Sequence, residues 1–304
     1  MDKLVVILGP TASGKSALAI KLARLFNGEI ISADSRQVYR GLDIGSGKIT
    51  KREMAGIPHH LLDVANPTRK FTVAQYQKLA RRTILQIQKR GRLPFLVGGT
   101  GFYIQSIVDG IVIPEVKPNW KLRKKLERKT IKELYQMLLK LDPARAANID
   151  PQNPRRLIRA IEIVKTTGKP VPPAGGRPTS TVDVGRPLLI GIKKSPQELK
   201  KLIAARLKKR IKGIIIEVKN LHLPVGRQAK TGLSFKRLEE LGLEYRFVAQ
   251  YLQQKISYGE MIDAIQKESL QFTKRQMTWF KRDQRIHWVK NQTEAQKLIK
   301  NFLH

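Results

Sequence analysis

The segment GPTASGKS, residues 9–16, constrains the fold of this chain more than any other stretch. Its spacing is G-x-x-x-x-G-K-[ST], in which glycines let backbone N–H groups surround an anion, Lys15 adds a positive charge and the Ser16 hydroxyl can bind Mg²⁺. Residues 5–8, VVIL, are typical of a buried strand, and leucines recur at helical spacing after the loop. A strand, a glycine loop and a helix N-terminus together form an anion site. The motif therefore predicts a bound diphosphate, whatever that diphosphate is attached to.

The next hundred residues continue to alternate strands and helices. A short strand through residues 30–31 ends at Asp34, and the run HHLLDV at 59–64 is a further strand candidate. A helix is expected over 72–90, followed by the strand and glycine turn of LPFLVGGTG. This order predicts an α/β fold, a P-loop-type parallel sheet with helices on both faces, whose ligands bind at the carboxyl ends of the strands.

The pattern changes near Pro114. Residues 119–141 are expected to form one charged amphipathic helix, and residues 154–167 a second one between the N-cap Asn153 and the stop at Gly168. A stretch rich in Pro, Gly, Ser and Thr then leads to a strand at 187–192. We therefore predict a helical insertion domain at residues 114–186 within a catalytic core of residues 1–113 and 187–304, whose C-terminal part is mostly helical.

The charge of the chain points to a polyanionic partner. It carries 59 Lys and Arg against 24 Asp and Glu, a formal charge of +35, which would repel itself in a compact fold. Nucleic acid is the first candidate, since no apolar run approaches the roughly 20 residues that span a bilayer. The N-terminus enters a strand at once, which leaves no room for a targeting peptide, and the absence of cysteine is compatible with a reducing cytoplasm.

Two residues near the predicted phosphate loop are candidates for chemistry. Asp34 follows a strand end, where it could accept a proton from a nucleophile, cap the next helix or bind a Mg²⁺ water. Thr100 lies in the turn GGTG at the same edge of the sheet, where it could contact substrate. The glycines of this turn could also be present only because they permit positive φ.

Basic residues in the insertion are candidates for contacts with nucleic acid. Arg155, Arg156 and Arg159 crowd the first two turns of their helix, where cations oppose the helix dipole. We therefore expect them to bind RNA phosphates rather than protein carboxylates. The alternative is a solvated charged face, because Leu157 and Ile158 belong to an apolar stripe suited to packing.

Two further patterns have a structural explanation. The segment TKRQMTWFKRD could stack RNA bases on Trp279 and Phe280, but these aromatic residues more commonly belong to a core. His59 and His60 look like metal ligands, yet adjacent residues on a strand point to opposite faces, so a shared metal is not expected.

Five segments, GPTASGKS, SADSRQVY, VGGTGFYI, NPRRLIRAIEI and KRQMTWF, together resemble the tRNA dimethylallyltransferase family, also called tRNA isopentenyltransferases. The resemblance covers nearly the whole chain, with the motifs in the family's order. It implies an enzyme, a prenyltransferase that moves a dimethylallyl group from dimethylallyl diphosphate to N6 of the tRNA adenosine that directly follows the anticodon. It also implies Mg²⁺ as cofactor, the tRNA anticodon stem-loop as partner, a cytoplasmic location and a monomer.

The resemblance also assigns roles to individual residues. It implies that Asp34 is the general base and that Thr11, Lys15 and Thr100 take part in catalysis, with Ser16 binding Mg²⁺. The residues implied in binding the diphosphate are Gly9, Pro10, Thr11, Ala12, Ser13, Gly14, Lys15 and Ser16. The residues implied in binding tRNA and its flipped adenosine are Asp34, Ser35, Arg36, Gln37, Thr100, Arg123, Arg155, Arg156, Leu157, Ile158 and Arg159.

Some features depart from the family or allow another function. Asp150 stands in a segment where the family often has a histidine, and the basic loop at 223–230 has no counterpart that we can name. A P-loop kinase or ATPase acting on RNA is the main alternative, but the strand LPFLVGG ends without the acidic Mg²⁺ ligand that such enzymes usually need, and Asp63 is a weak substitute. A non-catalytic RNA-binding protein would explain the charge and leave the phosphate loop unexplained.

Overall fold

The computed structural model of the chain describes residues 3–114, 116–172, 185–222 and 232–304. These residues form two compact units. The first unit comprises Met1–Val108 with Val182–His304, and the second comprises Asp109–Thr181. The second unit contains the helices that the sequence predicts as an insertion, and its assignment to tRNA stays a prediction. None of the described helices is both long and apolar enough to cross a membrane.

The first unit is built on a six-stranded sheet with the order β3-β2-β4-β1-β5-β6, in which all pairings are parallel. The strands are β1 Lys3–Leu8, β2 Gly28–Ala33, β3 His59–His60, β4 Leu93–Gly98, β5 Arg186–Ile192 and β6 His287–Val289. β1 lies in the interior of the sheet, with Val6 opposite Leu96 of β4 and Leu189 of β5. The predicted parallel α/β core is therefore confirmed, although the three-residue strand β6 was not predicted.

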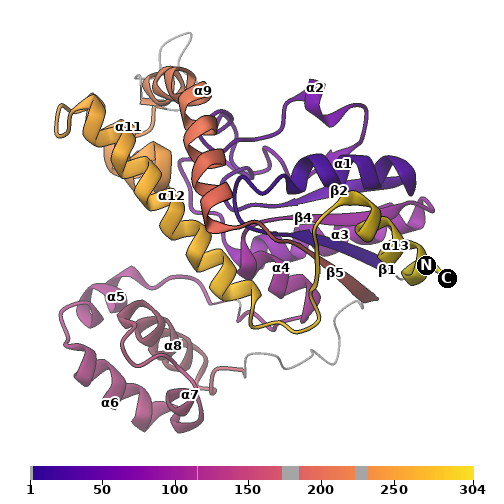
Figure 1. Cartoon of the computed structure of the whole chain (residues 1–304). Coiled ribbons are helices and arrows are strands. Elements are labelled where there is room, and N and C mark those ends of the chain that lie inside the picture. The colour runs from indigo at the N-terminus through magenta and orange to yellow at the C-terminus, as the bar shows by residue number, and fades with distance from the viewer. Residues whose placement is uncertain (1–2, 115, 173–184, 223–231) are drawn as a thin grey trace. The chain divides into compact units, whose positions relative to one another are not determined.

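Helices cover both faces of the sheet because β1 is apolar on both sides. Val5 and Ile7 pack with α1 (Lys15–Leu25) and α13 (Gln292–Leu303), whereas Leu4 and Val6 face the opposite layer. That layer contains α3 (Val73–Lys89) and α4 (Gly101–Val108) (Figure 1). Such continuous apolar runs are what a parallel sheet buried on both faces requires.

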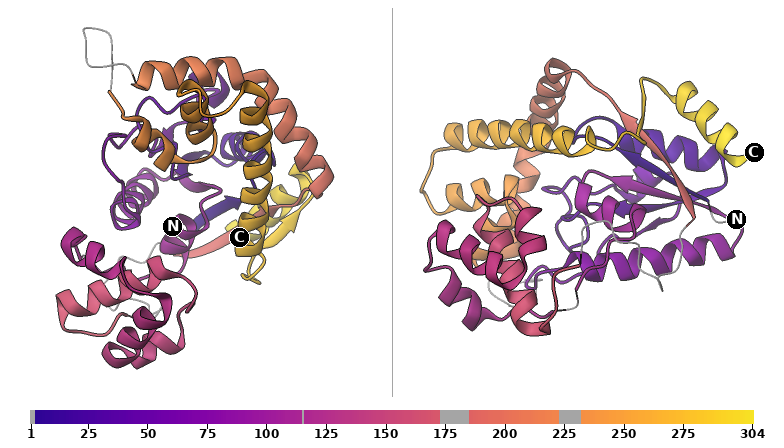
Figure 2. Two further views of the ribbon diagram at one scale, coloured as in Figure 1. Left: turned by 90° about the vertical axis from the view of Figure 1, so that its left-hand side faces the viewer. Right: turned by 90° about the horizontal axis from the view of Figure 1, so that it is seen from below.

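Further helices lie beyond the carboxyl edge of this sheet. They are α9 Pro196–His222, α10 Phe235–Leu241, α11 Leu243–Leu252 and α12 Tyr258–Phe280, while the short α2 Lys51–Met54 precedes β3. α9, α11 and α12 pack against one another, as the two views of Figure 2 show. The carboxyl edge, where ligands bind in such folds, is thus bordered by residues from distant parts of the sequence.

The described residues of the second unit form the helices α5 Trp120–Leu126, α6 Ile131–Leu141, α7 Pro143–Ala147 and α8 Pro154–Thr167. The single helix expected over 119–141 is wrong, because Thr130 starts a new helix by capping it. Its side chain accepts a hydrogen bond from the N–H of Glu133, whose carboxylate reaches back to the Thr130 N–H. α8 is confirmed, with Asn153 as its N-cap and Gly168 in the left-handed conformation at its end.

Candidate active site

The phosphate loop joins β1 to α1 as the motif predicts. Gly14 is the N-cap residue of α1 and has a φ of 88°, a conformation that favours glycine. A Cβ at Gly9 would lie only 3.1 Å from Oγ of Ser13 and 3.2 Å from the carbonyl oxygen of Ile192, so this position is too close-packed for a larger residue. Oγ of Ser13 is buried and has no hydrogen-bond partner among the described residues.

Lys15 lies at the base of this loop in a cluster of charges. Its Nζ donates a hydrogen bond to the carbonyl oxygen of Pro10 at 3.2 Å. The pKa of Lys15 is lowered to about 8. Burial is the main cause, the Arg206 guanidinium acts in the same direction, and the Asp34 carboxylate opposes the shift. Electrostatic interactions thus connect the phosphate loop, the end of β2 and helix α9 at one place.

The Asp34 turn and the second glycine turn are held together by hydrogen bonds. Oδ1 of Asp34 accepts from the N–H groups of Arg36 and Gln37, at 2.8 and 3.4 Å, so Asp34 does cap its own turn. The N–H of Ser35 donates to Oγ1 of Thr100 at 3.0 Å. The structure therefore brings Asp34, Ser35 and Thr100 to the same edge, as the sequence predicts, while their catalytic and tRNA-binding roles stay predictions.

The glycines around Thr100 are required by close packing rather than by backbone conformation. Gly98, Gly99 and Gly101 do not have positive φ, so the alternative explanation offered by the sequence is wrong. A Cβ at Gly99 would lie 2.4 Å from Nε2 of Gln276, and one at Gly101 would lie 2.4 Å from the Trp279 ring. The Gln276 and Trp279 side chains of α12 therefore occupy the space that a Cβ at Gly99 or Gly101 would need, and they would have to move to admit one.

Sequence reasoning missed two residues that touch the phosphate loop. Gln276 of α12 accepts a hydrogen bond from the N–H of Thr11 at 2.9 Å and donates one to the carbonyl oxygen of Gly99 at 2.8 Å. Nη1 of Arg206, on α9, donates to Oγ1 of Thr11 at 3.2 Å. Gln276 lies 265 positions from Thr11 in the sequence and Arg206 lies 195 positions from it, so no local pattern could place them at the loop. The only sequence signal was an uncharged glutamine in the motif KRQMTWF.

The aromatic residues near the C-terminus of α12 belong to the core. Phe280 is buried and Trp279 is partly buried against the same cluster, which bears out the structural explanation of this segment. Trp279 also packs edge-on against Phe102 of α4, with ring centroids 6.3 Å apart.

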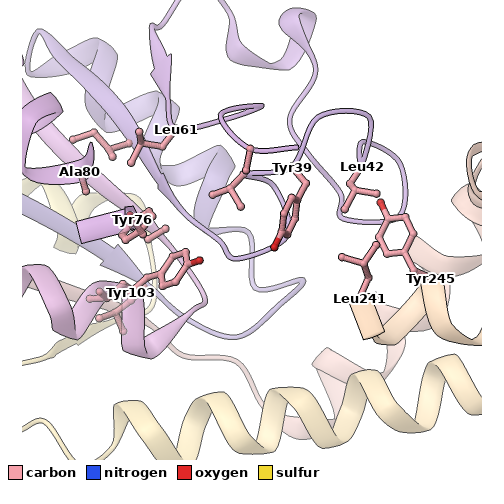
Figure 3. Close-up of a cluster of buried hydrophobic side chains, with 14 of the residues drawn as sticks. Tyr39, Leu42, Leu61, Tyr76, Ala80, Tyr103, Leu241 and Tyr245 are labelled. Carbon is pink, nitrogen blue, oxygen red and sulfur yellow. The ribbon is translucent and has the colours of Figure 1, made fainter. Parts of the chain in front are cut away.

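Two stacked tyrosines lie beneath the Asp34 turn. The rings of Tyr76 and Tyr103 are 4.0 Å apart and nearly parallel (Figure 3). The Tyr76 hydroxyl donates to the carbonyl oxygen of Ser32, two residues before Asp34, at 3.0 Å. Burial raises the pKa of both tyrosines, and the nearby Asp34 carboxylate contributes to the shift, so both stay neutral. Tyr76 holds the end of β2 through its hydroxyl, and Tyr103 packs against the Tyr76 ring.

A partly buried network also fixes the loop that follows the Asp34 turn. The Glu217 carboxylate, from α9, accepts from the N–H groups of the three consecutive residues 43–45 and from the Tyr245 hydroxyl at 2.7 Å. Next to them, the carbonyl oxygen of Gly47 accepts from Nε2 of Gln37 at 3.3 Å. A Cβ at Gly47 would collide with Arg206, so this loop, α9 and Gln37 form one closely packed region.

In the second unit, two predicted tRNA-binding arginines share one buried carboxylate. Glu162 accepts from Nε and Nη2 of Arg123 at 2.8 and 2.6 Å, and from Nη1 of Arg159 at 2.6 Å. Arg159 also donates to the carbonyl oxygen of Val116 at 3.1 Å. The expectation that Arg159 has no protein carboxylate as partner is therefore wrong, because the helix that carries it also supplies Glu162.

The rest of that helix divides into a buried and an exposed side. The side chains of Leu157 and Ile158 are buried in the core of this unit and serve packing, so any contact of these two residues with tRNA, which stays a prediction, would involve their backbone. Arg155 and Arg156 are exposed, and among the described residues neither forms an ion pair. Of the arginines on α8, these two are therefore the ones suited to an external phosphate.

The two adjacent histidines and Asp150 each contact a different partner. Nε2 of His60 lies 2.6 Å from Oε2 of Glu29, whereas Nδ1 of His59 lies 2.8 Å from the carbonyl oxygen of Ile57. Asp150 accepts from the N–H of Gln152 at 3.1 Å within its own turn. The basic loop at 223–230 lies outside the described residues. Within the described parts of the chain, no three His, Asp or Glu side chains are grouped so that they could hold a metal by themselves.

Comparison with known proteins identifies relatives over nearly the whole chain. The profile of the family described as IPP transferase matches residues 37–283. The chain is 42% identical to the tRNA dimethylallyltransferase of Carboxydothermus hydrogenoformans over 97% of its own length and 94% of the relative. It is also 42% identical to tRNA dimethylallyltransferase 1 of Syntrophus aciditrophicus, over 95% and 94%.

Solved structures agree with these relatives. The tRNA isopentenylpyrophosphate transferase of Bacillus halodurans matches with a TM-score of 0.69 at 36% identity, covering 100% of this chain and 96% of the other. A eukaryotic dimethylallyltransferase acting on tRNA matches with a TM-score of 0.75 at 28% identity, covering 91% of this chain and 69% of the other.

Proposed function

Since the chain belongs to the IPP transferase family of tRNA dimethylallyltransferases, we propose that it transfers a dimethylallyl group from dimethylallyl diphosphate to N6 of the adenosine that follows the anticodon in tRNA. One observation carries this proposal: the chain is 42% identical to a tRNA dimethylallyltransferase over 97% of its own length. Its own sequence contains an intact phosphate loop, and Lys15 of that loop interacts electrostatically with Asp34. The +35 charge supports a polyanionic substrate such as tRNA.

The reaction is an alkyl transfer. N6 of the adenosine attacks C1 of the dimethylallyl group, the C1–O bond breaks, and the diphosphate leaves with the bonding electron pair. The proton that N6 loses passes to the carboxylate of Asp34, which would need to lie within hydrogen-bond reach of N6 in the bound complex. The phosphate loop therefore binds a leaving group in this proposal and transfers no phosphoryl group.

The loop at residues 9–16 would stabilise the leaving diphosphate as negative charge develops on it. Backbone N–H groups at the start of α1 supply donors, and Lys15 supplies a charge. Arg206 donates to Thr11 and lies close enough to Lys15 to lower the pKa of that residue, so it would add a second cation beside the diphosphate. The buried hydroxyl of Ser13 is a further donor without a protein partner among the described residues.

The site suits a Mg²⁺ ion that the protein and the bound diphosphate would coordinate together. The Ser16 side chain is exposed in the first turn of α1, next to Lys15, and can supply one oxygen ligand. Because the described residues contain no cluster of three carboxylates or histidines, the other ligands would be diphosphate oxygens and water. When bound, the ion would neutralise part of the charge on the leaving group.

The acceptor adenosine would be held by the turn of residues 34–37 together with Thr100. Extrusion of the base from its stack is the expected route into such a site. Arg155 and Arg156 of the second unit, whose side chains are exposed, are the proposed contacts with the anticodon stem-loop. Arg123 and Arg159 would reach a tRNA phosphate only by leaving the Glu162 carboxylate that both of them bind. A cytoplasmic monomer is the form in which we propose that the enzyme acts.

Nucleoside analysis tests this function directly. Purified protein incubated with Mg²⁺, dimethylallyl diphosphate and tRNA should yield N6-(dimethylallyl)adenosine in the digested tRNA, detected by mass spectrometry, without ATP. Lys15→Ala should lose most of this activity. A strict requirement for a nucleoside triphosphate would instead support the kinase or ATPase alternative.

A further inference from the structure

The side chain of Gln276 connects two loops that carry different parts of the proposed reaction. Its Oε1 accepts from the N–H of Thr11 in the phosphate loop at 2.9 Å, and its Nε2 donates to the carbonyl oxygen of Gly99 at 2.8 Å. The residue is 6% exposed, so water cannot readily replace either partner. These hydrogen bonds span 265 and 177 positions of sequence and join α12 to the carboxyl ends of both β1 and β4.

Both partners specify an amide at this position. A backbone N–H can only donate and a backbone carbonyl can only accept, so the side chain between them must present one acceptor and one donor. A glutamine does so, and its two partners also determine which way its amide is turned. An ionised glutamate would place an oxygen against the Gly99 carbonyl, and a methionine of similar length would satisfy neither partner.

The backbone around Gln276 is shaped to allow this approach. A Cβ at Gly99 would lie 2.4 Å from Nε2 of Gln276, which would displace the amide from its partners. Thr100 follows Gly99 in the chain, and its Oγ1 accepts a hydrogen bond from the N–H of Ser35 at 3.0 Å. Ser35 directly follows Asp34. A path of hydrogen bonds and peptide links therefore runs from the loop for the leaving group to the turn that carries the proposed base.

We propose that Gln276 is a positioning residue that sets the separation between the bound diphosphate and Asp34. The proposal rests on the proposed function, because only that function places the leaving group at one end of the path and proton acceptance at the other. Alkyl transfer requires C1 of the donor and N6 of the acceptor to lie in line with the departing oxygen. A shift of about 1 Å in such a geometry costs on the order of 10²-fold in rate.

Two substitutions separate the two ends of the bridge. Gln276→Glu keeps an acceptor for Thr11 and removes the donor to Gly99, and it adds a negative charge near the diphosphate. Gln276→Met removes both hydrogen bonds without adding charge. Gln271→Glu, at an exposed position of the same helix, is the matched control for a glutamine-to-glutamate change.

The measurements are the single-turnover rate of dimethylallyl transfer, the affinity for dimethylallyl diphosphate and the affinity for tRNA. Both substitutions at Gln276 should slow the transfer step by about 10- to 100-fold, with tRNA affinity within about twofold of wild type because base stacking and phosphate contacts lie elsewhere. Gln276→Glu should in addition weaken donor binding, whereas Gln276→Met should do so much less. Gln271→Glu should match wild type in all three.

The pH dependence gives a readout that loss of stability alone would not change. A protonated carboxyl presents one donor and one acceptor, as an amide does, and burial favours that neutral form. The transfer rate of Gln276→Glu relative to wild type, measured well below both melting temperatures, should therefore rise as pH falls from 8 to 5.5. The relative rate of Gln276→Met should stay constant over this range.

The outcomes distinguish this inference from the proposed function. If wild-type protein does not alkylate tRNA with dimethylallyl diphosphate, the proposed function fails. If wild type is active and both Gln276 variants fold and transfer at the wild-type rate, the function stands and the positioning role is overturned. Variants with lowered melting temperature but wild-type single-turnover rates would assign Gln276 to stability alone, which also overturns the proposal.

Discussion

The carboxylate of Glu162 is fully buried and accepts hydrogen bonds from Nε and Nη2 of Arg123, at 2.8 and 2.6 Å. Arg159 donates to the same carboxylate at 2.6 Å, and so does the N–H of Asn119 at 2.7 Å. One acidic residue thus compensates two guanidinium groups inside a unit that is otherwise strongly basic. Its four donors connect the start of α5 with the middle of α8.

Glu162→Gln should destabilise the second unit. Removal of one charge from a buried ion pair leaves the partners uncompensated and typically costs about 3–5 kcal/mol of unfolding free energy. Urea unfolding followed by circular dichroism measures this loss. Glu133→Gln is the control, because Glu133 is exposed and a glutamine can also serve the capping box of α6, so its effect on the unfolding free energy should be much smaller. Equal effects of the two substitutions would contradict a special role for Glu162.

The same carboxylate should make this unit sensitive to acid. Burial by itself would raise the pKa of Glu162, but hydrogen bonds from Arg123 and Arg159 outweigh it and hold the pKa below its usual range. A carboxyl with a depressed pKa in the folded state stabilises the fold above its unfolded pKa of about 4.3, and this contribution is lost as pH falls through the folded value. Melting temperatures should therefore drop more steeply below pH 4.5 in wild type than in Glu162→Gln.

Asp34 can be tested so that its capping role and its role as base are separated. Asp34→Asn keeps an oxygen that can accept from the N–H groups of Arg36 and Gln37 but cannot take up a proton from N6. We expect both Asp34→Asn and Asp34→Ala to slow the transfer step by about 10²–10⁴-fold, the usual contribution of a positioned base, with tRNA affinity little changed. A single-turnover rate near wild type in Asp34→Asn would leave Asp34 with the cap alone.

Local sequence was sufficient to predict the longer strands of the sheet, the phosphate loop and the caps of α8, whereas the three-residue strand β6 was missed. These features depend on residues within a few positions of one another: the apolar run of β1, the glycines of the loop, and Asn153 with Gly168. The same local reasoning failed at Thr130, where a capping box within a continuous amphipathic pattern divides one expected helix into two.

The parts of the site that could not be predicted depend on tertiary contacts. Gln276 and Arg206 reach the phosphate loop only because α9 and α12 pack beyond the carboxyl edge of the sheet. The glycines at 99 and 101 looked like a conformational requirement, whereas the close approach of α12 explains them. Arg159 was assigned to RNA from the helix dipole, but the decisive interaction is with Glu162, one turn along the same helix.

Donor binding should weaken in mild alkali because of Lys15. Its pKa in the free protein is about 8, and the protonated form is the one that attracts a diphosphate. Affinity for dimethylallyl diphosphate should therefore be constant from pH 7 to about 8 and fall above it, by up to about tenfold per pH unit. Isothermal titration calorimetry between pH 7 and 9.5 checks this. Lys15→Met should bind more weakly with no such decline, and a similar decline in that variant would assign the titration to another group.

The arginines of α8 should separate into two functional classes when replaced singly. Arg155 and Arg156 are exposed and form no ion pair among the described residues, whereas Arg159 is bound to Glu162 and to the carbonyl oxygen of Val116. The exposed pair is therefore suited to tRNA phosphates, and Arg159 to holding the fold of its own unit. Salt-dependent binding and unfolding measurements on the same variants distinguish these roles.

Arg155→Ala and Arg156→Ala should each weaken tRNA binding and reduce the slope of log affinity against log salt by about 0.7 to 0.9, the effect of one lost phosphate contact. Neither should change the melting temperature appreciably, because both side chains are exposed. Arg159→Ala should instead lower the unfolding free energy by about 1–3 kcal/mol, since it removes a hydrogen bond to a buried carboxylate and those to the carbonyl oxygen of Val116, with a nearly unchanged salt slope. Affinity for dimethylallyl diphosphate should stay at the wild-type value in all three variants, because the diphosphate is assigned to the other unit. If Arg159→Ala reduced the salt slope by the same 0.7 to 0.9 (about one phosphate contact) and left stability intact, Arg159 would be shown to leave Glu162 and bind a phosphate when tRNA binds.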